Sequence, residues 1–506
     1  NVSSAASDVY KRQIFPLLWK IYINLSMHKD ILKIKTELDK QAAKLDLSKR
    51  YDYEFHSCAD HILSSGSMAY RSKLSGYTKE VHRLFNEIFN ILEVEQKLEG
   101  MYSGDMLNTS EHKAALHSHY RLGDKNLPDQ DFVKKIRDKA SLHSSKIFKN
   151  LVTFGIGGSF EGPKLLIEFM RKGTDTPDSF FITGPDPSEF EQVVKPLINK
   201  DTFYIFSSKS FSTKETLQSL AWVSKHLNAD NCLAITANPE QALKLGFDKT
   251  CIIEFPEEVG GRYSIWSPIS APSIIYSNKS TDNTPGASSD SLQWDEFIGG
   301  GAETDARLLN VQDGRANYLE FLKTLSFSDL WHSNFLGKEN RVVLSYSWQL
   351  RSFTNYVQQL EMESLGKKAC KHSVFKKTGQ NIFGGYGPTA QHSYYQLLHQ
   401  GTSNSCADFV SLNNTGLLQW SQEQSQSDLF TDGNFNNELQ EIERVNSNIP
   451  SNLFKIDGIA GLGFLLASWE HRTFVTAAML EINPFDQFGV SAGKIVSKKY
   501  FNEHGD

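Results

Sequence analysis

A run of hydroxyl and lysine side chains, SSKSFSTKET, occupies positions 207–216 and is the first feature of the sequence that suggests chemistry. It follows a strand-like run, DTFYIF, and precedes a segment whose apolar residues recur at helical spacing. At a turn from a strand into a helix, free backbone N–H groups and the helix dipole favour a negative charge. The alternative is a solvated surface loop. The neighbouring strand and helix favour an anion-binding loop, and phosphate is the expected ligand.

A second loop, GIGGSFEGP at 155–163, follows the strand-like run LVTF and opens a helical segment. Glycine there also suits an ordinary tight turn. Its spacing differs from the dinucleotide fingerprint, and it has no GK[ST] sequence of a P-loop. Two loops of small residues at the carboxyl edge of one sheet suit a phosphorylated small molecule better than a nucleotide.

The segment SWQLRSFTNYVQQLEMESLGK contains the first candidate for proton transfer, Glu363. Gln359, Glu363 and Lys367 are four residues apart, so they share one face of the expected helix. Alone, such a glutamate is most simply a solvated residue or one paired with lysine. With a phosphate loop elsewhere in the chain, it becomes a candidate general base.

Three further groups complete the candidate set. In GGYGPTAQHSYYQLLHQG, Pro388 and Thr389 suit a helix start and Gly401 a helix end, which places His392 in the first turn. The helix dipole there would disfavour the protonated imidazole and keep it a neutral proton carrier. Arg262 follows two glycines in GGRYSIWS, and Lys494 ends INPFDQFGVSAGK. Their simpler explanations are a structural histidine, an ion pair and solvation.

The order of apolar runs predicts the elements that must position these groups. Five short runs alternate with helical segments and predict a doubly wound parallel α/β sheet: 151–154, 179–183, 202–206, 232–236 and 251–255. Two later runs, 342–346 and 408–412, predict a second α/β unit, and the polar stretch 277–291 suggests the boundary. We expect the following regions: a leader at 1–26, a helical region at 27–145, a smaller sugar-phosphate-binding α/β domain at 146–290, and a second α/β domain with C-terminal helices at 291–506.

Composition narrows the partners and the compartment. The 53 basic and 59 acidic residues give a net charge of -6 without a long basic tract, so we expect no nucleic acid. Five cysteines, widely spaced and without a CxxC pair, indicate neither a disulfide framework nor a zinc site and fit the cytoplasm. The apolar stretch at 14–25 resembles a signal peptide, but Lys20 interrupts it and it is too short to span a membrane. Met27 is an alternative start of the native chain.

Taken in order, several blocks closely resemble the phosphoglucose isomerase family, and the likeness runs from about residue 50 to residue 500. The blocks are GIGGS, SSKSFSTKET, GGRYSIWS, QLEMESLGK, TAQHSYYQLLHQG and INPFDQFGVSAGK. The resemblance implies two domains of sugar-isomerase type and the interconversion of glucose 6-phosphate and fructose 6-phosphate, in glycolysis and gluconeogenesis. No metal and no cofactor is implied.

The resemblance also implies a role for each site residue. It assigns binding of the sugar phosphate to these residues: Gly158, Ser159, Ser208, Lys209, Ser210, Thr213, Thr216 and Gln359. Glu363 would move a proton between carbons 2 and 1 through a cis-enediolate, which Arg262 would stabilise. His392, helped by Lys494, would open the sugar ring, and family members are homodimers in which this histidine reaches the neighbouring subunit's site.

Three other readings remain open at this point. A sugar-phosphate-binding regulator would need only the two phosphate loops. An aldose isomerase with a broader substrate range, such as one acting on mannose 6-phosphate, would differ by small shifts in the site. A secreted signalling role, which some members of the family acquire, would depend on the stretch at 14–25.

Overall fold

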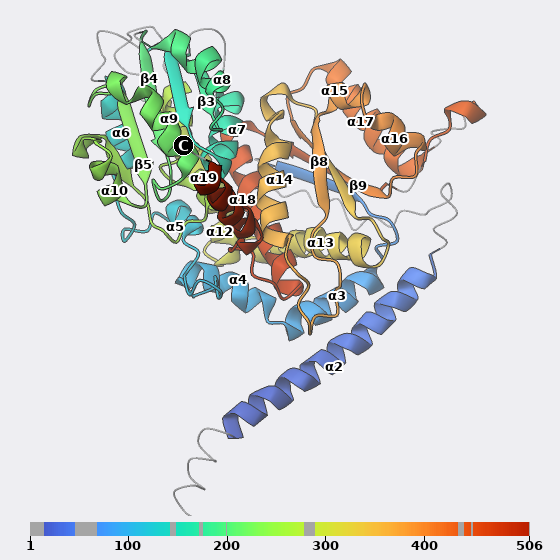
Figure 1. The fold of residues 1–506 in the computed structure, drawn as a ribbon. Coiled ribbons are helices and arrows are strands. Elements are labelled where there is room, and N and C mark those ends of the chain that lie inside the picture. Colours follow the sequence, from blue (N-terminus) through green and yellow to red (C-terminus); the bar gives the residue numbers. More distant parts are fainter. Residues whose placement is uncertain are drawn as a thin grey trace, which may run out of the picture.

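The structure is a computed structural model of the 506-residue chain. It describes residues 15–45, 68–141, 148–171, 176–198, 200–277, 289–433, 440–446 and 449–504. No helix in these ranges has an apolar run long enough to cross a membrane. Two α/β units lie side by side, and a helical base that includes α3 (Lys79–Ile91) and α4 (Val94–Ser103) lies below them (Figure 1).

The first sheet has five parallel strands in the order β3-β2-β4-β5-β6. Its strands are β2 (Asn150–Phe154), β3 (Asp178–Ile182), β4 (Thr202–Ser207), β5 (Cys232–Thr236) and β6 (Ile252–Glu254). The helices between and around them are α6 (Phe132–Ser141), α7 (Glu161–Met170), α8 (Pro187–Glu189), α9 (Lys214–Val223), α10 (Pro239–Lys244) and α11 (Ala271–Ser277). All five strands predicted for this sheet are confirmed, and the central β4 and its neighbour β5 are buried at every residue, whereas most of β3 is half-buried.

The second sheet has the order β1-β10-β9-β7-β8. Its strands are β1 (Met68–Lys73), β7 (Asn340–Ser345), β8 (Asn381–Tyr386), β9 (Ser405–Leu412) and β10 (Ser451–Ile456). The runs at 342–346 and 408–412 correspond to β7 and β9, whereas β8, β10 and β1 were not predicted. β1 lies in the region expected to be helical and pairs antiparallel with β10. Its MAYRSK sequence alternates buried and half-buried residues, as an edge strand does.

The other α-helices lie below the two sheets, between them, against the second sheet or at the C-terminal end of the chain (Figure 1). They are α5 (His117–Leu122), α12 (Ser289–Leu308), α13 (Arg315–Asn334), α14 (Phe353–Leu365), α15 (Gly387–Gln391), α16 (Tyr395–Gln400), α17 (Leu417–Asp432), α18 (Gly458–Met479) and α19 (Ser491–His504). At the N-terminal side, α2 (Phe15–Ala43) runs without a break across Met27. The expected leader therefore lies partly in this helix and partly outside the described residues, as does most of the polar stretch at 277–291.

The large apolar core lies between the two sheets. Alternate residues of both sheets, such as Phe203 and Ile205 in β4 and Val343 in β7, belong to this central cluster. Their neighbours, such as Phe206 in β4 and Leu344 in β7, pack into two smaller clusters on the outer faces. Because strand side chains alternate, each sheet divides its apolar residues between an inner and an outer layer.

The central helix α18 is buried along nearly its whole length. Successive residues on a helix point about 100° apart, so its consecutive polar residues Glu470, His471 and Arg472 reach different partners. Glu470 accepts hydrogen bonds from Arg121 at 2.7 Å and from Trp266 at 2.8 Å. These two donors belong to α5 and to the 3-10 helix η7 (Gly261–Trp266). The core is thus tied to the segment that carries Arg262.

Glycines allow α12 and α18 to approach each other closely. A Cβ atom added to Gly300 would lie 1.9 Å from the carbonyl oxygen of Ala460, and one added to Gly463 would lie 2.1 Å from that of Phe297. Both distances are shorter than a Cβ atom can approach a backbone oxygen, so a side chain at either position would push the two helices apart. By contrast, a Cβ on Gly299 in the same helix would meet no atom within 4 Å.

We predict opposite effects for two alanine substitutions that are adjacent in α12. Gly300→Ala should lower the free energy of unfolding by about 1–3 kcal/mol, because the helices must separate. Gly299→Ala should raise it by up to about 1 kcal/mol, because alanine favours the helix more than glycine does. Urea titration followed by circular dichroism measures both, and equal effects of the two changes would contradict the close helix contact.

Two carboxyl groups near α18 share one guanidinium. Arg121 bonds Asp305 through Nε at 2.7 Å and Glu470 through Nη1 at 2.7 Å, and all three are buried. Burial raises the pKa of Glu470 to about 7, although Arg121 opposes this effect. Burial also favours the neutral form of Asp305, but Arg121 and His471 outweigh it and lower its pKa to about 2. One positive charge therefore holds Asp305 ionised and leaves Glu470 close to protonation.

This arrangement predicts a pH dependence of stability. Because the folded pKa of Glu470 lies above its unfolded value, its contribution is fully present below about pH 4.5 and is lost as the pH rises through 7. Glu470→Gln keeps an acceptor for Trp266 but does not titrate. The unfolding free energy of the native chain relative to Glu470→Gln should fall by about 2–3 kcal/mol between pH 5 and pH 8. Urea unfolding at both pH values tests this, and a constant difference would contradict it.

Candidate active site

The loop after β4 has the form expected of an anion-binding turn. Phe211 adopts a left-handed conformation with φ of 47° and its side chain is buried. Its backbone N–H donates to Ser208 Oγ at 3.2 Å. The carbonyl oxygen of Lys209 accepts from the Ala237 N–H at 3.0 Å, just after β5. The loop is therefore anchored by Phe211, by the buried Ser208 and by its backbone, whereas Ser210 and Ser212 are exposed.

The polar groups of this loop surround the N-terminus of α9. Thr213 is the N-cap residue, and its side chain makes no cap hydrogen bond within the described part of the helix. Ser210 Oγ lies 2.6 Å from Ser212 Oγ, and both residues are exposed. Thr216 lies in the first turn and is buried. This geometry supports the predicted binding of a phosphate group at this end of α9.

The second predicted loop packs directly on the segment that carries Arg262. Gly157, Gly158 and Ser159 form a 3-10 turn, η2, after β2. A Cβ on Gly158 would lie 1.8 Å from the carbonyl oxygen of Gly261, so only glycine fits. Gly157 has a φ of 61°, and a Cβ there would lie 2.9 Å from Gln359 Nε2. The structure thus brings this loop, the segment that carries Arg262 and α14 to one place.

Arg262 is buried and held by a set of oxygen acceptors. Its Nε donates to Ser364 Oγ at 2.7 Å and its Nη1 to Gln487 Oε1 at 2.8 Å. Its Nη2 donates to the carbonyl oxygens of Pro484 and Asp486. Because four groups fix the guanidinium, its Nη1 points at Glu363, whose Oε2 lies 3.3 Å away.

Glu363 lies in an open pocket of about 830 Å³ between α14 and the segment before α19. The predicted shared face holds for Gln359 and Glu363 in α14, whereas the helix ends at Leu365 and Lys367 lies beyond it; all three nevertheless line this pocket. The Glu363 side chain is 35% exposed, so a substrate reaches its carboxylate from solvent. A fixed cation beside an accessible carboxylate suits proton transfer that creates a negative charge.

A neighbouring pocket of about 820 Å³ contains Lys209 of the phosphate loop. Gln487 lines both this pocket and the one that contains Glu363. Burial lowers the pKa of Lys209, and the nearby Glu257 opposes this effect. The loop predicted to bind phosphate and the Glu363 carboxylate therefore lie on either side of Gln487. This arrangement suits a substrate that carries a phosphate at one end.

Gln487 is a member of this site that the sequence analysis did not single out. Lys367 Nζ donates to the carbonyl oxygen of Asp486 at 2.6 Å and forms an ion pair with the Asp486 carboxylate at 3.5 Å. Together with Arg262, these contacts hold the segment 484–487 across the end of α14. The glutamine stands in the INPFDQFGVSAGK block, but only its position beside Arg262 shows its place in the site.

The expected position of His392 in the first turn of a helix is wrong. α15 starts at Gly387 beside Pro388, as predicted, but ends at Gln391, and His392 is its C-cap residue. A second helix, α16, begins at Tyr395 and ends at Gln400, with Gly401 as its C-cap residue. Tyr395 at the start of α16 is buried, and its hydroxyl lies 2.8 Å from that of Tyr346. His392 therefore lies in the short link between α15 and α16 and not in the first turn of either helix.

His392 and Glu363 lie at opposite ends of the second α/β unit. Glu363 is near the end of α14, the chain then returns through β8, and α15 follows at the far end of that strand. A strand of this length spans about 20 Å. The imidazole is exposed, and His392 does not line either of the two site pockets described above. Within one chain, the two residues are therefore not brought together.

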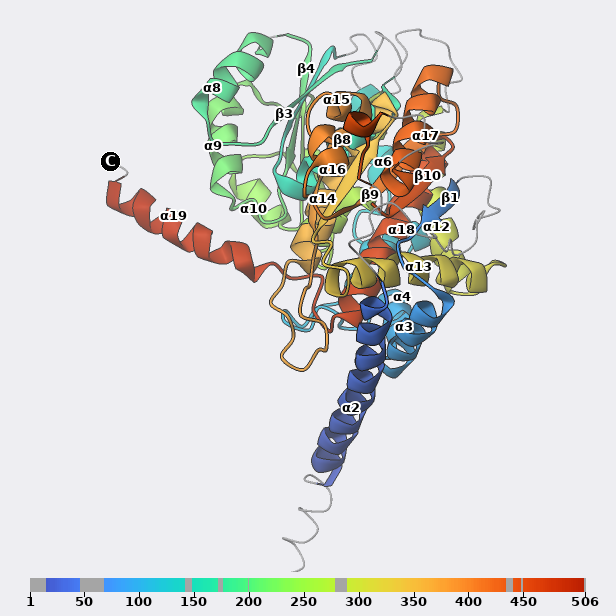
Figure 2. The ribbon, with the colours of Figure 1, turned by 90° about the vertical axis from the view of Figure 1, so that its right-hand side faces the viewer.

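Lys494 lies in the first turn of α19 and is exposed. Gly489 and Val490, just before this helix, line the pocket that contains Glu363, but Lys494 does not. α19 extends away from the body of the molecule (Figure 2). α19 contacts the end of the phosphate loop through Phe501: Lys214 Nζ, at the start of α9, lies 3.8 Å from the centre of the Phe501 ring.

The fold and the site define an α/β enzyme of the phosphosugar isomerase type. A family model described as phosphoglucose isomerase matches residues 72–436 and 419–505. A glucose-6-phosphate isomerase of Shewanella baltica is 32% identical over 463 residues, which cover 79% of this chain and 81% of the relative. One of Shewanella halifaxensis is 30% identical over 475 residues, which cover 82% of this chain and 84% of the relative. The chain belongs to the phosphoglucose isomerase family.

A solved structure agrees with this fold. The crystal structure of a glucose-6-phosphate isomerase from Chlamydia trachomatis superimposes with a TM-score of 0.75 at 23% sequence identity. The match covers 94% of this chain and 96% of that chain. It therefore extends over both α/β units and the helices that surround them.

Proposed function

We propose that this enzyme interconverts glucose 6-phosphate and fructose 6-phosphate through ring opening and a cis-enediolate, in glycolysis and gluconeogenesis. The observation that carries the proposal is the contact between the Arg262 guanidinium and the accessible Glu363 carboxylate. The curated relatives from Shewanella are glucose-6-phosphate isomerases, which supports the choice of substrate. The expected cytoplasmic location is part of this proposal, since the cysteine pattern favours a reducing compartment.

The phosphate would be held by the first α/β unit, which we take as the domain 146–290. The hydroxyls of Ser210 and Thr213 and the backbone N–H groups at the start of α9 are placed to receive it. Ser159 would contribute from the neighbouring loop and Gln359 from α14. Binding at this point would hold the sugar chain across Gln487 toward Glu363.

The central step would be proton transfer between adjacent carbons. Glu363 would remove the proton from carbon 2 of the open-chain sugar and return it to carbon 1. The negative charge would develop on the two oxygens of the enediolate. Arg262 is buried and fixed by other acceptors, so it needs little rearrangement to stabilise that charge.

Ring opening would need a second chain. His392 would move a proton between the ring oxygen and the carbon 1 hydroxyl, with Lys494 nearby, yet His392 is far from Glu363 within one chain. A homodimer would bring the exposed His392 of one chain to the pocket of the other. The apolar side chains of Phe488, Ile495 and Val496 are exposed on the 3-10 helix η11 (Phe488–Val490) and on α19, which is consistent with burial against a second copy.

Replacement of Glu363 tests the proposed base. Glu363→Gln should lower kcat by about a hundredfold to ten-thousandfold while sugar-phosphate binding is kept. It should also stop the incorporation of deuterium from heavy water at carbon 2, which NMR measures directly. Glu161→Gln makes the same change in another carboxylate of the same pocket and is the matched control.

The control should exchange deuterium at close to the native rate. Unchanged turnover in Glu363→Gln would show that another group is the base. Loss of turnover in Glu161→Gln alone would move the assignment to that residue. A comparison of fructose 6-phosphate with mannose 6-phosphate in the same assay would define the substrate range. If the native chain bound sugar phosphate without turnover, the alternative of a sugar-phosphate-binding regulator would be favoured.

Mixed dimers test the composite site. A dimer of one His392→Gln chain and one Glu363→Gln chain should have one intact site and one doubly altered site. Isolated by two affinity tags, this heterodimer should therefore show about half of the native activity, whereas each parent homodimer should be nearly inactive. If His392 instead acts within its own chain, the heterodimer will be as inactive as its parents.

A further inference from the structure

Two cysteines that are far apart in the sequence lie together in the first sheet. Cys232 is the first residue of β5, and Cys251 directly precedes β6, which pairs with β5. Ala234 pairs with Ile252, so Cys251 lies one residue out of register with Cys232. With about 4.8 Å between strands and about 3.3 Å per residue along them, the two Cα atoms are about 6 Å apart, within the range of about 4.4–6.8 Å that a disulfide spans. Both are free thiols, and their Sγ atoms donate to the carbonyl oxygens of adjacent residues, Cys232 to Asn228 at 3.2 Å and Cys251 to Ala229 at 3.3 Å. A covalent link between these side chains therefore requires little movement of the backbone.

A buried lysine lies beside one of the two thiols. Lys139, near the end of α6, has its Nζ 3.5 Å from Cys251 Sγ. The same Nζ donates to the carbonyl oxygen of Ala229 at 2.5 Å, and Cys251 Sγ lies 3.3 Å from that oxygen. If Cys251 loses its proton, Lys139 still donates a hydrogen bond to the carbonyl oxygen of Ala229. The thiolate would then have both an amine and the Cys232 thiol as neighbours.

These contacts shift the pKa values of the two thiols in opposite directions. The hydrogen bond from Cys232 and the charge of Lys139 lower the pKa of Cys251 to about 6, although burial opposes them. The hydrogen bond to Cys251 and burial raise the pKa of Cys232. Since the thiolate is the reactive form, Cys251 is the nucleophile and Cys232 stays protonated beside it.

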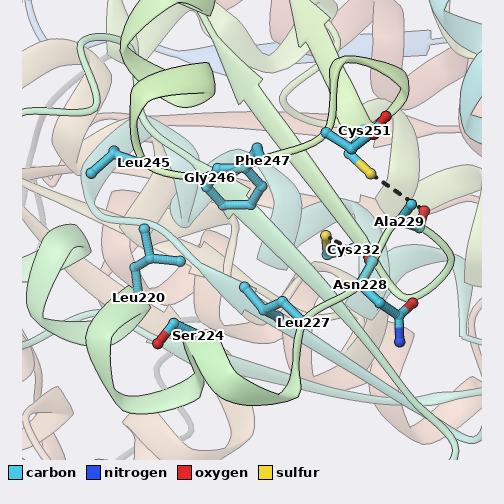
Figure 3. A pocket seen from close by; sticks show the side chains of 11 residues that line it. Leu220, Ser224, Leu227, Asn228, Ala229, Cys232, Leu245, Gly246, Phe247 and Cys251 are labelled. Carbon is cyan, nitrogen blue, oxygen red and sulfur yellow. Dashed lines mark hydrogen bonds between the residues drawn. The ribbon is translucent and has the colours of Figure 1, made fainter.

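A pocket of about 460 Å³ gives access to the pair (Figure 3). Both cysteines line it, together with apolar side chains such as Leu220, Leu227 and Phe247. Cys232 and Cys251 are otherwise buried, so a reagent reaches them through this pocket. It lies at the amino ends of β5 and β6, at the opposite edge of the parallel sheet from the phosphate loop. The pair is thus separate from the proposed active site.

We propose that Cys232 and Cys251 form a peroxide-sensitive dithiol that closes to a disulfide. Cys251 thiolate attacks an oxygen of hydrogen peroxide, so that an S–O bond forms, the O–O bond breaks, and hydroxide leaves. Cys232 then attacks this sulfenic sulfur, an S–S bond forms, and the second oxygen leaves as water after taking up a proton. Two thiols are oxidised, one peroxide is reduced to two waters, and a dithiol reductant reverses the reaction.

Peptide mapping by mass spectrometry tests this proposal on the full chain. The reduced protein is treated with one equivalent of hydrogen peroxide, alkylated in denaturant and digested. A linked peptide containing Cys232 and Cys251 should form before Cys370 or Cys406 is modified. The initial rate should rise about tenfold between pH 5 and pH 7, whereas a thiol with an ordinary pKa would show a rise of about a hundredfold.

Single serine variants distinguish the roles of the two thiols. In Cys232→Ser, dimedone should trap a sulfenic acid on Cys251, and no linked peptide should form. In Cys251→Ser, Cys232 should remain reduced at the same peroxide dose. Circular dichroism confirms that both variants fold. Separate alkylation of both cysteines in the peroxide-treated native chain, or faster oxidation of Cys370, would overturn the proposal.

Discussion

The structure depends on a buried polar cluster around one helix. Glu470, His471 and Arg472 are consecutive in α18, and each reaches a different part of the chain. Glu470 binds Arg121 and Trp266, His471 lies within 3 Å of the Tyr102 and Tyr318 hydroxyls, and Arg472 binds Asp329 and Asp408. Buried charges are tolerated only when they are paired and hydrogen-bonded. The requirement to satisfy these groups therefore fixes how α4, α5, α12, α13 and β9 are arranged around α18.

This arrangement also explains how a precise site forms between two α/β units. Trp266 ends the same 3-10 helix that begins at Gly261 and carries Arg262, so its bond to Glu470 ties the guanidinium to the core. The glycine contact between Gly158 and Gly261 then places the second loop against that helix. Rigid elements from both units thus define the positions of Arg262 and Glu363, whereas the exposed His392 is left for a neighbouring chain in our proposal.

Sequence patterns predicted the first sheet better than the second. The five strands of the first sheet are uninterrupted apolar runs with helices between them, and such runs are read without knowledge of their neighbours. β8 contains Gly384 and Gly385 with positive φ, and β1 is a polar edge strand more than 370 residues from its partner in β10. Pairing over such distances depends on the packed neighbours, so local residue preference does not reveal it.

By itself the sequence determined the types of group in the site and the local turns that present them. The hydroxyl-rich loop before α9, the glycine turn after β2 and the shared face of Gln359 and Glu363 follow from short-range periodicity and backbone preference. The tertiary structure alone decided which distant groups meet: Gln487 beside Arg262, Cys232 beside Cys251, and His392 at the end of a broken helix. The physical reason is that packing and the pairing of buried polar groups act between residues far apart in the chain, where no sequence spacing records them.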